Sequence, residues 1–265
     1  MDNKHCRLHT MNCRSESGET RGYALDGLVV DVLKDDVSSA GYFEDRARFK
    51  FLCKLACEGV WIPRLQRQPS YQTLIIFDWD DTLLCTSYLT KFAAFGLQDL
   101  SNPVRNTLKV VEKNVLELLE LAIACGQTFI ITNAQCGWVE SSAKLWAPSL
   151  LSVLRNVQVV SARSCYEEQF PNDATRWKCE AFLDVSRHLD NQVITNLVSL
   201  GDSEHEMKAT QIMGEEFQRA SVKFVKFTPL PSPKELQQQL TLVYQAFKDI
   251  LGRGSNLSIR LTREP

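Results

Sequence analysis

The sequence predicts an α/β fold, a three-layer sandwich in which helices cover both faces of a central parallel sheet of five strands. From residue 71 onward, short apolar runs alternate with segments of helical periodicity. This alternation is typical of parallel sheets, because each strand needs a crossover helix. One apolar run, 73–77, is followed by the carboxylates of Asp78, Asp80 and Asp81. Ligand sites of open α/β sheets lie at the carboxyl ends of strands, so these residues mark the expected site.

The main domain is expected to span residues 71–251. Its five strands are predicted at 73–77, 128–132, 157–160, 195–200 and 222–227. Its helices are predicted at 106–125, 139–154, 175–189, 204–218 and 233–251, where apolar side chains recur at helical spacing, and Pro148 interrupts the second of them. Gly126 directly follows the first helix, in the position where glycine commonly ends one.

Both ends of the chain differ from this pattern. Residues 1–22 are polar and lack periodicity, so they are predicted to be disordered. Residues 23–70 are expected to form an N-terminal extension that packs on the main domain, with a helix at 43–57 whose apolar residues lie on or near one face. Residues 252–265 are expected to form a loose C-terminal tail.

The composition excludes several classes of protein. The 265 residues are 44% hydrophobic and 23% charged, with a net charge of −2. No basic excess indicates a nucleic-acid partner, and no apolar run approaches the roughly 18 residues of a membrane-spanning helix, so a soluble protein is expected. The nine cysteines are scattered and odd in number, which favours reduced thiols. A cytoplasmic location is expected, with the nucleus or an organelle as alternatives, and the oligomeric state is left open.

The carboxylates after the first strand of the main domain indicate a metal ion. Like charges crowded at one point repel each other and raise each other's pKa. A divalent cation would remove this cost, because hard cations take oxygen ligands. Asp-rich turns after strands are also often merely solvated, so the other strand ends decide between the two interpretations.

Two further strand ends supply groups that suit phosphoryl chemistry. Thr132 and Asn133 end the second strand of the main domain, and Asp202 and Glu206 follow its fourth strand. Lys178 lies near the start of the crossover helix that leads into that fourth strand. The carboxyl ends of parallel strands converge on one edge of the sheet. A hydroxyl and a lysine beside several carboxylates suit a phosphoryl group held against a metal ion.

On these residues, the segment 71–228 resembles the haloacid dehalogenase (HAD) superfamily of phosphohydrolases. The matches are Asp78-Trp79-Asp80-Asp81-Thr82 to the first motif, DxDx[TV], Thr132 to the second, Lys178 to the third, and Asp202 with Glu206 to the fourth. Asp81 stands where the family most often has glycine. Three roles remain open for it: tuning the metal site, capping the following turn, or facing solvent.

The resemblance implies a phosphatase mechanism. Asp78 would attack phosphorus and form an aspartyl phosphate, while Asp80 would protonate the leaving oxygen and later accept a proton from the hydrolytic water. Mg²⁺ would be the cofactor, held by Asp78, by the backbone carbonyl of Asp80 and by Asp202. Glu206 would orient a metal-bound water or the lysine of the third motif.

The remaining motif residues would bind the phosphoryl group. Thr132, with Asn133 beside it, would donate a hydrogen bond to a phosphoryl oxygen. Lys178 would offset phosphoryl charge and keep the nucleophile ionised. Lys144 and Lys208 are the alternatives for this cation.

The spacing of the motifs implies a site without a large cap. Family members differ mainly in cap domains that close over small substrates. Each of the intervals 82–128 and 133–178 holds about 45 residues, and the first leaves only about 20, 84–103, enough for a short hairpin flap. An open site favours a bulky phosphorylated substrate such as a phosphoprotein. The alternatives are a phosphatase of small molecules or nucleotides, and a non-catalytic HAD-like binding protein.

Overall fold

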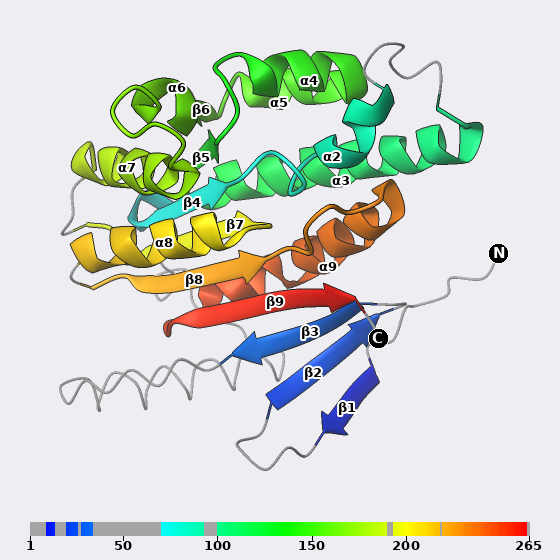
Figure 1. Cartoon of the computed structure of the whole chain (residues 1–265). Coiled ribbons are helices and arrows are strands. Elements are labelled where there is room, and N and C mark those ends of the chain that lie inside the picture. Colours follow the sequence, from blue (N-terminus) through cyan, green and yellow to red (C-terminus); the bar gives the residue numbers. More distant parts are fainter. Residues whose placement is uncertain are drawn as a thin grey trace.

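The chain forms one mixed sheet of nine strands flanked by helices (Figure 1). The computed structural model describes the backbone of residues 9–13, 20–25 and 28–33, and, with side chains, residues 70–92, 100–189, 193–217 and 219–263. The helix predicted at 43–57 lies outside these residues. The strands are β1 His9–Cys13, β2 Thr20–Leu25, β3 Leu28–Leu33, β4 Thr73–Phe77, β5 Gln127–Thr132, β6 Gln158–Ser161, β7 Asn196–Gly201, β8 Ser221–Lys226 and β9 Leu257–Arg263.

Six of these strands are parallel, in the spatial order β6-β5-β4-β7-β8-β9. Counted along the chain from β4, this is the order 3-2-1-4-5-6 of a Rossmann-like sheet. The α/β class is therefore confirmed. The five predicted strands lie within one residue of their expected bounds, and β9 is an additional parallel strand.

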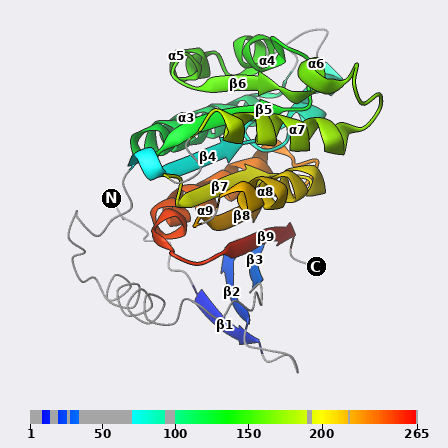
Figure 2. The same cartoon turned by 90° about the vertical axis from the view of Figure 1, so that its left-hand side faces the viewer.

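Helices cover both faces of the parallel strands (Figure 2). They are α2 Thr86–Leu89, α3 Asn102–Cys125, α4 Trp138–Trp146, α5 Leu151–Leu154, α6 Ala162–Tyr166, α7 Ala174–Arg187, α8 Glu204–Glu216 and α9 Pro233–Gly252, with short 3-10 turns at Ser70–Gln72, Thr90–Phe92 and Pro148–Leu150. One core joins the sheet to α3, α4, α5 and α9, and the other joins it to α7 and α8. In the part of the chain that the structure describes, no helix is long and apolar enough to cross a membrane.

The central strand β4 is buried on both faces. Ile75 and Phe77 belong to the core under α3 and α9, whereas Leu74 and Ile76 belong to the core under α7 and α8. A strand covered on both sides reads as an unbroken apolar run because it has no solvent face. Full burial of such a side chain contributes roughly 1.5–3 kcal/mol to the stability of the fold, so the position of Asp78 directly after this strand is well fixed.

The prediction of a loose tail at 252–265 is wrong for β9. Leu257, Ile259 and Leu261 are buried in the core that includes α9, while the residues between them are partly exposed. This is the period-two pattern of a half-buried strand. Seven alternating residues are a weak sequence signal for a strand. The strand forms because β9 pairs with β8 on one side and with β3 on the other.

The N-terminal residues differ from the expected disorder. The strand β1 lies entirely within 1–22, and β2 begins inside this segment. The strands β1, β2 and β3 pair antiparallel and continue the sheet beyond β9. Polar composition does not prevent such pairing, because backbone groups form the ladder.

The long helix between β4 and β5 differs from the prediction at its start and agrees with it at its end. The helix α3 begins four residues before the predicted start, with Pro103 in its first turn, where the missing N–H costs nothing. Gly126 ends it with an extended backbone; a Cβ there would lie 2.5 Å from the Thr73 carbonyl oxygen, so close approach to β4 requires glycine. In the interval 84–103, where a short hairpin flap is expected, the described residues form α2, a 3-10 turn and the start of α3. The rest of this interval, 93–99, lies outside the described residues.

Candidate active site

The strand order brings the predicted site residues to one edge of the sheet. The strand β4 lies between β5 and β7, and Phe77 aligns with Ile130 and Leu200 on the two sides. The backbone N–H of Asp78 donates to the Leu200 carbonyl at 2.8 Å, which extends the pairing by one residue. The chain crosses from one side of β4 to the other at this point, where open α/β sheets bind ligands.

Lys178 connects the ends of all three strands. Its Nζ lies 2.6 Å from Asp78 Oδ1, 3.0 Å from Glu206 Oε1 and 2.6 Å from the Ile131 carbonyl oxygen. The three N–H donors of the ammonium group can thus each meet an oxygen. Lys178 is fully buried. The alternatives, Lys144 and Lys208, lie on exposed helix positions, so Lys178 is the lysine beside Asp78.

Asp78 and Glu206 both contact Lys178, but their pKa values shift in opposite directions. Burial raises the pKa of Asp78 well above its ordinary value; Lys178 lowers it, and the nearby carboxylates raise it again. Burial would also raise the pKa of Glu206, but Lys178 and hydrogen bonds from Ser203 lower it to about 2. For Lys178, burial favours the neutral amine, yet the two carboxylates prevail and raise its pKa. The ammonium therefore stays charged between the two carboxylates, 2.6 Å from Asp78 Oδ1 and 3.0 Å from Glu206 Oε1.

Asp202 adds a further, partly buried carboxyl group to the same edge. Burial, followed by the charges of Glu206 and Asp81, raises the pKa of Asp202 to about 7, although Lys226 and Lys178 oppose the shift. Lys226 donates to the backbone carbonyl of Asp202 at 2.8 Å. Hard divalent cations take carboxylate oxygens as ligands, so Asp78 and Asp202 are the side chains at this edge that could contribute to a cation site. Among the described residues, no group of three or more His, Cys, Asp or Glu side chains is arranged so that it could hold a metal ion.

Glu206 is fixed by the start of helix α8. Ser203 caps this helix, and its backbone N–H donates to Glu206 Oε2 at 3.0 Å. The Ser203 hydroxyl donates to the same oxygen. A Cβ on Gly201 would lie 2.5 Å from Glu206 Cγ, so glycine makes room for the buried side chain. The sequence signal for this arrangement is the Ser-x-x-Glu capping pattern of residues 203–206. Glu206 thus forms an ion pair with Lys178 at 3.0 Å, and its expected role in orienting this lysine or a metal-bound water stays a prediction.

Both carboxylate oxygens of Asp80 accept hydrogen bonds. Thr132 Oγ1 lies 3.1 Å from Asp80 Oδ2, and the indole Nε1–H of Trp138 donates to Asp80 Oδ1 at 2.8 Å. Thr132 also accepts from the backbone N–H of Ala134 at 2.9 Å. The structure therefore adds Trp138 to the site. No sequence signal points to it, because an indole at a helix start usually serves packing.

Asn133 points toward the helix that carries Lys178. Its Nδ2 donates to the Ala174 carbonyl at 3.1 Å, at the first residue of α7. Its Oδ1 is buried without a hydrogen-bond partner. The predicted contact of Asn133 with phosphate remains a prediction.

Asp81 caps the turn that follows the motif, which is one of the three roles left open for it. Its φ of 55° is in the left-handed region, which favours glycine and tolerates aspartate among the other residues. Its Oδ1 accepts the backbone N–H of Ser87 at 3.0 Å, in the first turn of α2. Burial raises its pKa. The neighbouring Trp79 is buried and donates from Nε1 to Ser142 Oγ at 2.9 Å.

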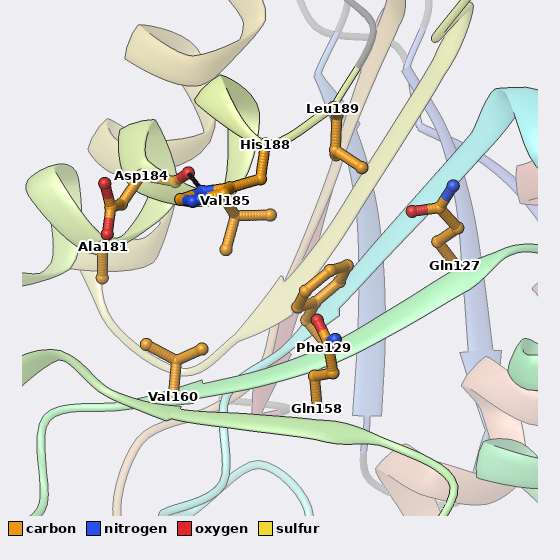
Figure 3. A pocket seen from close by; sticks show the side chains of 9 residues that line it. All are labelled: Gln127, Phe129, Gln158, Val160, Ala181, Asp184, Val185, His188 and Leu189. Carbon is orange, nitrogen blue, oxygen red and sulfur yellow. Dashed lines mark hydrogen bonds between the residues drawn. The ribbon is translucent and has the colours of Figure 1, made fainter.

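A separate cavity of about 410 Å³ lies at the opposite ends of the strands (Figure 3). It is bounded by the first residues of β5 and β6, Gln127 and Gln158, and by the last turns of α7. Its His188 has Nδ1 2.7 Å from the Asp184 carbonyl of the same helix. None of the predicted site residues lines this cavity. The cavity is therefore separate from the group of residues at the carboxyl edge.

Comparison of the chain with protein-family models, curated proteins and solved structures finds no match. The carboxyl edge of the sheet carries three aspartates, Asp78, Asp80 and Asp202. Asp78 is buried and pairs with Lys178. Such a set can attack, protonate and hold a cation around one phosphoryl group.

Proposed function

We propose that this protein is a Mg²⁺-dependent phosphatase of the HAD type, which hydrolyses phosphate monoesters through an aspartyl phosphate on Asp78. The observation that carries the proposal is the 2.6 Å contact between Lys178 Nζ and Asp78 Oδ1 at the end of the central strand. A buried carboxylate with a perturbed pKa and a specific charge partner at a ligand-binding edge is a functional-site candidate.

Two carboxylates divide the covalent chemistry. Asp78 attacks phosphorus, so that its Oδ–P bond forms as the bond from phosphorus to the leaving oxygen breaks. Asp80 gives its proton to that oxygen. It then takes a proton from water, whose oxygen bonds to phosphorus and releases Asp78 as a carboxylate with inorganic phosphate. The two-residue spacing suits this division, since both side chains follow the same strand.

The groups around Asp78 compensate the negative charge of the phosphoryl group. Lys178 offsets phosphoryl charge, and Thr132 donates a hydrogen bond to a phosphoryl oxygen. Asp78, the backbone carbonyl of Asp80 and Asp202 would hold Mg²⁺, a hard cation that takes oxygen ligands. When bound, Mg²⁺ supplies positive charge that polarises the phosphoryl group.

The substrate is proposed to be bulky, such as a phosphoprotein. Between β4 and β5 the described residues hold α2, a 3-10 turn and α3, and between β5 and α7 they hold short helices and β6. Neither interval contains a separate folded cap in the part of the chain that the structure describes. A site without a cap is accessible to a phosphorylated loop or terminus.

The proposed activity is tested with the purified protein and 4-nitrophenyl phosphate. Hydrolysis should require Mg²⁺, stop with a chelator and fall by at least about 100-fold in Asp78→Asn, because no nucleophile remains. Asp249→Asn, an exposed change on α9, is the matched control and should retain wild-type activity. Equal rates for the wild type and Asp78→Asn would refute catalysis and favour a binding protein.

The substrate class is tested by kcat/KM on phosphopeptides, nucleotides and small phosphate esters. A bulky-substrate phosphatase should prefer phosphopeptides. A strong preference for a nucleotide or a small metabolite would overturn the phosphoprotein assignment and leave the hydrolytic mechanism in place.

A further inference from the structure

We propose that Trp138 is a positioning residue that holds Asp80 while the phosphoryl group is bound; this inference rests on the proposed phosphatase function. The indole Nε1 of Trp138 lies 2.8 Å from Asp80 Oδ1, and Thr132 Oγ1 lies 3.1 Å from the other oxygen, Oδ2. Asp80 is the carboxylate to which the mechanism assigns proton transfer, so what fixes its direction matters for catalysis.

Thr132 cannot hold Asp80 and phosphate at the same time. Its Oγ1 accepts the backbone N–H of Ala134 at 2.9 Å, which leaves the hydroxyl proton for Asp80. A hydroxyl has a single proton to donate. When Thr132 turns this proton to a phosphoryl oxygen, Oδ2 of Asp80 is released. Trp138 is then the remaining side-chain donor to Asp80 among those that the structure describes.

The released Oδ2 is the atom that the proton transfer requires. With Oδ1 held by the indole of Trp138, Oδ2 can carry the proton that Asp80 gives to the leaving oxygen. The same atom then receives the proton of the attacking water. An indole N–H only donates, so it holds a carboxylate oxygen without competing for that proton.

The local backbone and its hydrogen bonds fix the position of Trp138. Gly137 precedes it with a φ of 80°, a left-handed conformation that glycine adopts without strain, and serves as the N-cap of α4. The Ser142 hydroxyl donates to the Trp138 carbonyl at 2.6 Å and accepts from Nε1 of Trp79 at 2.9 Å. Trp79 stands between Asp78 and Asp80 in the chain. Hydrogen bonds through Ser142 therefore connect the start of α4 to the acidic motif of residues 78–82.

The kinetic test compares Trp138→Phe with Trp146→Phe, the same change at a buried position further along α4. Losing the indole N–H should matter most when the leaving oxygen needs a proton. We expect kcat/KM of Trp138→Phe to fall at least about tenfold more on an alkyl phosphate than on 4-nitrophenyl phosphate, with KM nearly unchanged. Trp146→Phe should affect both substrates equally.

Equal losses on the two substrates in Trp138→Phe would show a merely structural role and overturn the inference, provided that wild-type turnover depends on Asp78. Wild-type protein without Asp78-dependent turnover would instead overturn the proposed function, and the catalytic role of Trp138 with it. The two failures are therefore distinguishable.

A second measurement tests the contact without turnover. The chain has five tryptophans, and each gives one indole N–H signal in a ¹⁵N-correlated NMR spectrum. The signal absent from Trp138→Phe identifies Trp138. In Asp80→Ala this signal should move upfield and exchange faster with solvent, while the Trp146 signal stays in place. An unmoved Trp138 signal would overturn the contact and the inference.

Discussion

Lys178 and Asp78 form a buried ion pair across 100 residues of chain, with 2.6 Å between Nζ and Oδ1. Both side chains are almost inaccessible to solvent, 1% for the lysine and 6% for the aspartate. The pair joins the crossover helix α7 to the central strand, so it is a part of the fold as well as of the proposed site.

Lys178→Met should destabilise the protein strongly. The change leaves Asp78 and Glu206 buried without their cation, and removing one partner of a buried pair costs roughly 3–5 kcal/mol. Chemical denaturation at neutral pH measures the free energy of unfolding. Lys208→Met, at an exposed position of α8, should change it by less than about 0.5 kcal/mol. A loss below about 1 kcal/mol in Lys178→Met would contradict the buried pair.

Stability should fall in acid because of Glu206. Burial opposes its ionisation, but Lys178 and Ser203 lower its pKa from 4.5 to about 2. A carboxyl with a lowered folded-state pKa stabilises the fold above its unfolded pKa, and this stabilisation is lost as the pH falls from about 4.5 towards 2. The unfolding free energy of Glu206→Gln, measured over this window, should depend less on pH. Glu215→Gln, exposed on the same helix, should follow the wild type.

Mg²⁺ should stabilise the wild type and do so less in acid. Ligand at 100 times its Kd stabilises a fold by about 2.7 kcal/mol. Because the pKa of Asp202 is raised to about 7, protons compete with the cation below that pH, so the Mg²⁺-dependent rise in Tm should be larger at pH 8 than at pH 6. Asp202→Asn should abolish this rise, whereas Asp249→Asn should keep it. A persistent rise in Asp202→Asn would remove Asp202 from the cation site.

Gly201→Ala should displace Glu206. The added Cβ would lie 2.5 Å from Glu206 Cγ, and this side chain is held on both oxygens by Ser203 and Lys178. Overpacking of a tight site costs about 1–3 kcal/mol, and the phosphatase rate should fall with the loss of the Lys178 contact. Gly252→Ala is the control, because its Cβ would have no neighbour within 4 Å. Full activity in Gly201→Ala would mean that Glu206 is dispensable for orienting Lys178.

Local patterns were sufficient to predict the main strands and the acidic motif. The run 73–77 is apolar throughout because a central strand is covered on both faces, and the prediction matches β4 residue for residue. The half-buried β9 was missed, because its seven alternating residues acquire their meaning only through pairing with β8 and β3. The position of Thr132 at the end of a strand predicts its place in the site, but its hydrogen bond to Asp80 is not predictable from the sequence.

The sequence alone determined the alternation of strands and helices and the carboxylates that end the first strand of the main domain, since both depend on residues close together in the chain. The tertiary structure decided which strand ends become neighbours, which lysine reaches Asp78 and that Trp138 reaches Asp80. The reason is physical: these contacts form between distant segments, and the burial of both sheet faces, more than any local pattern, selects their arrangement.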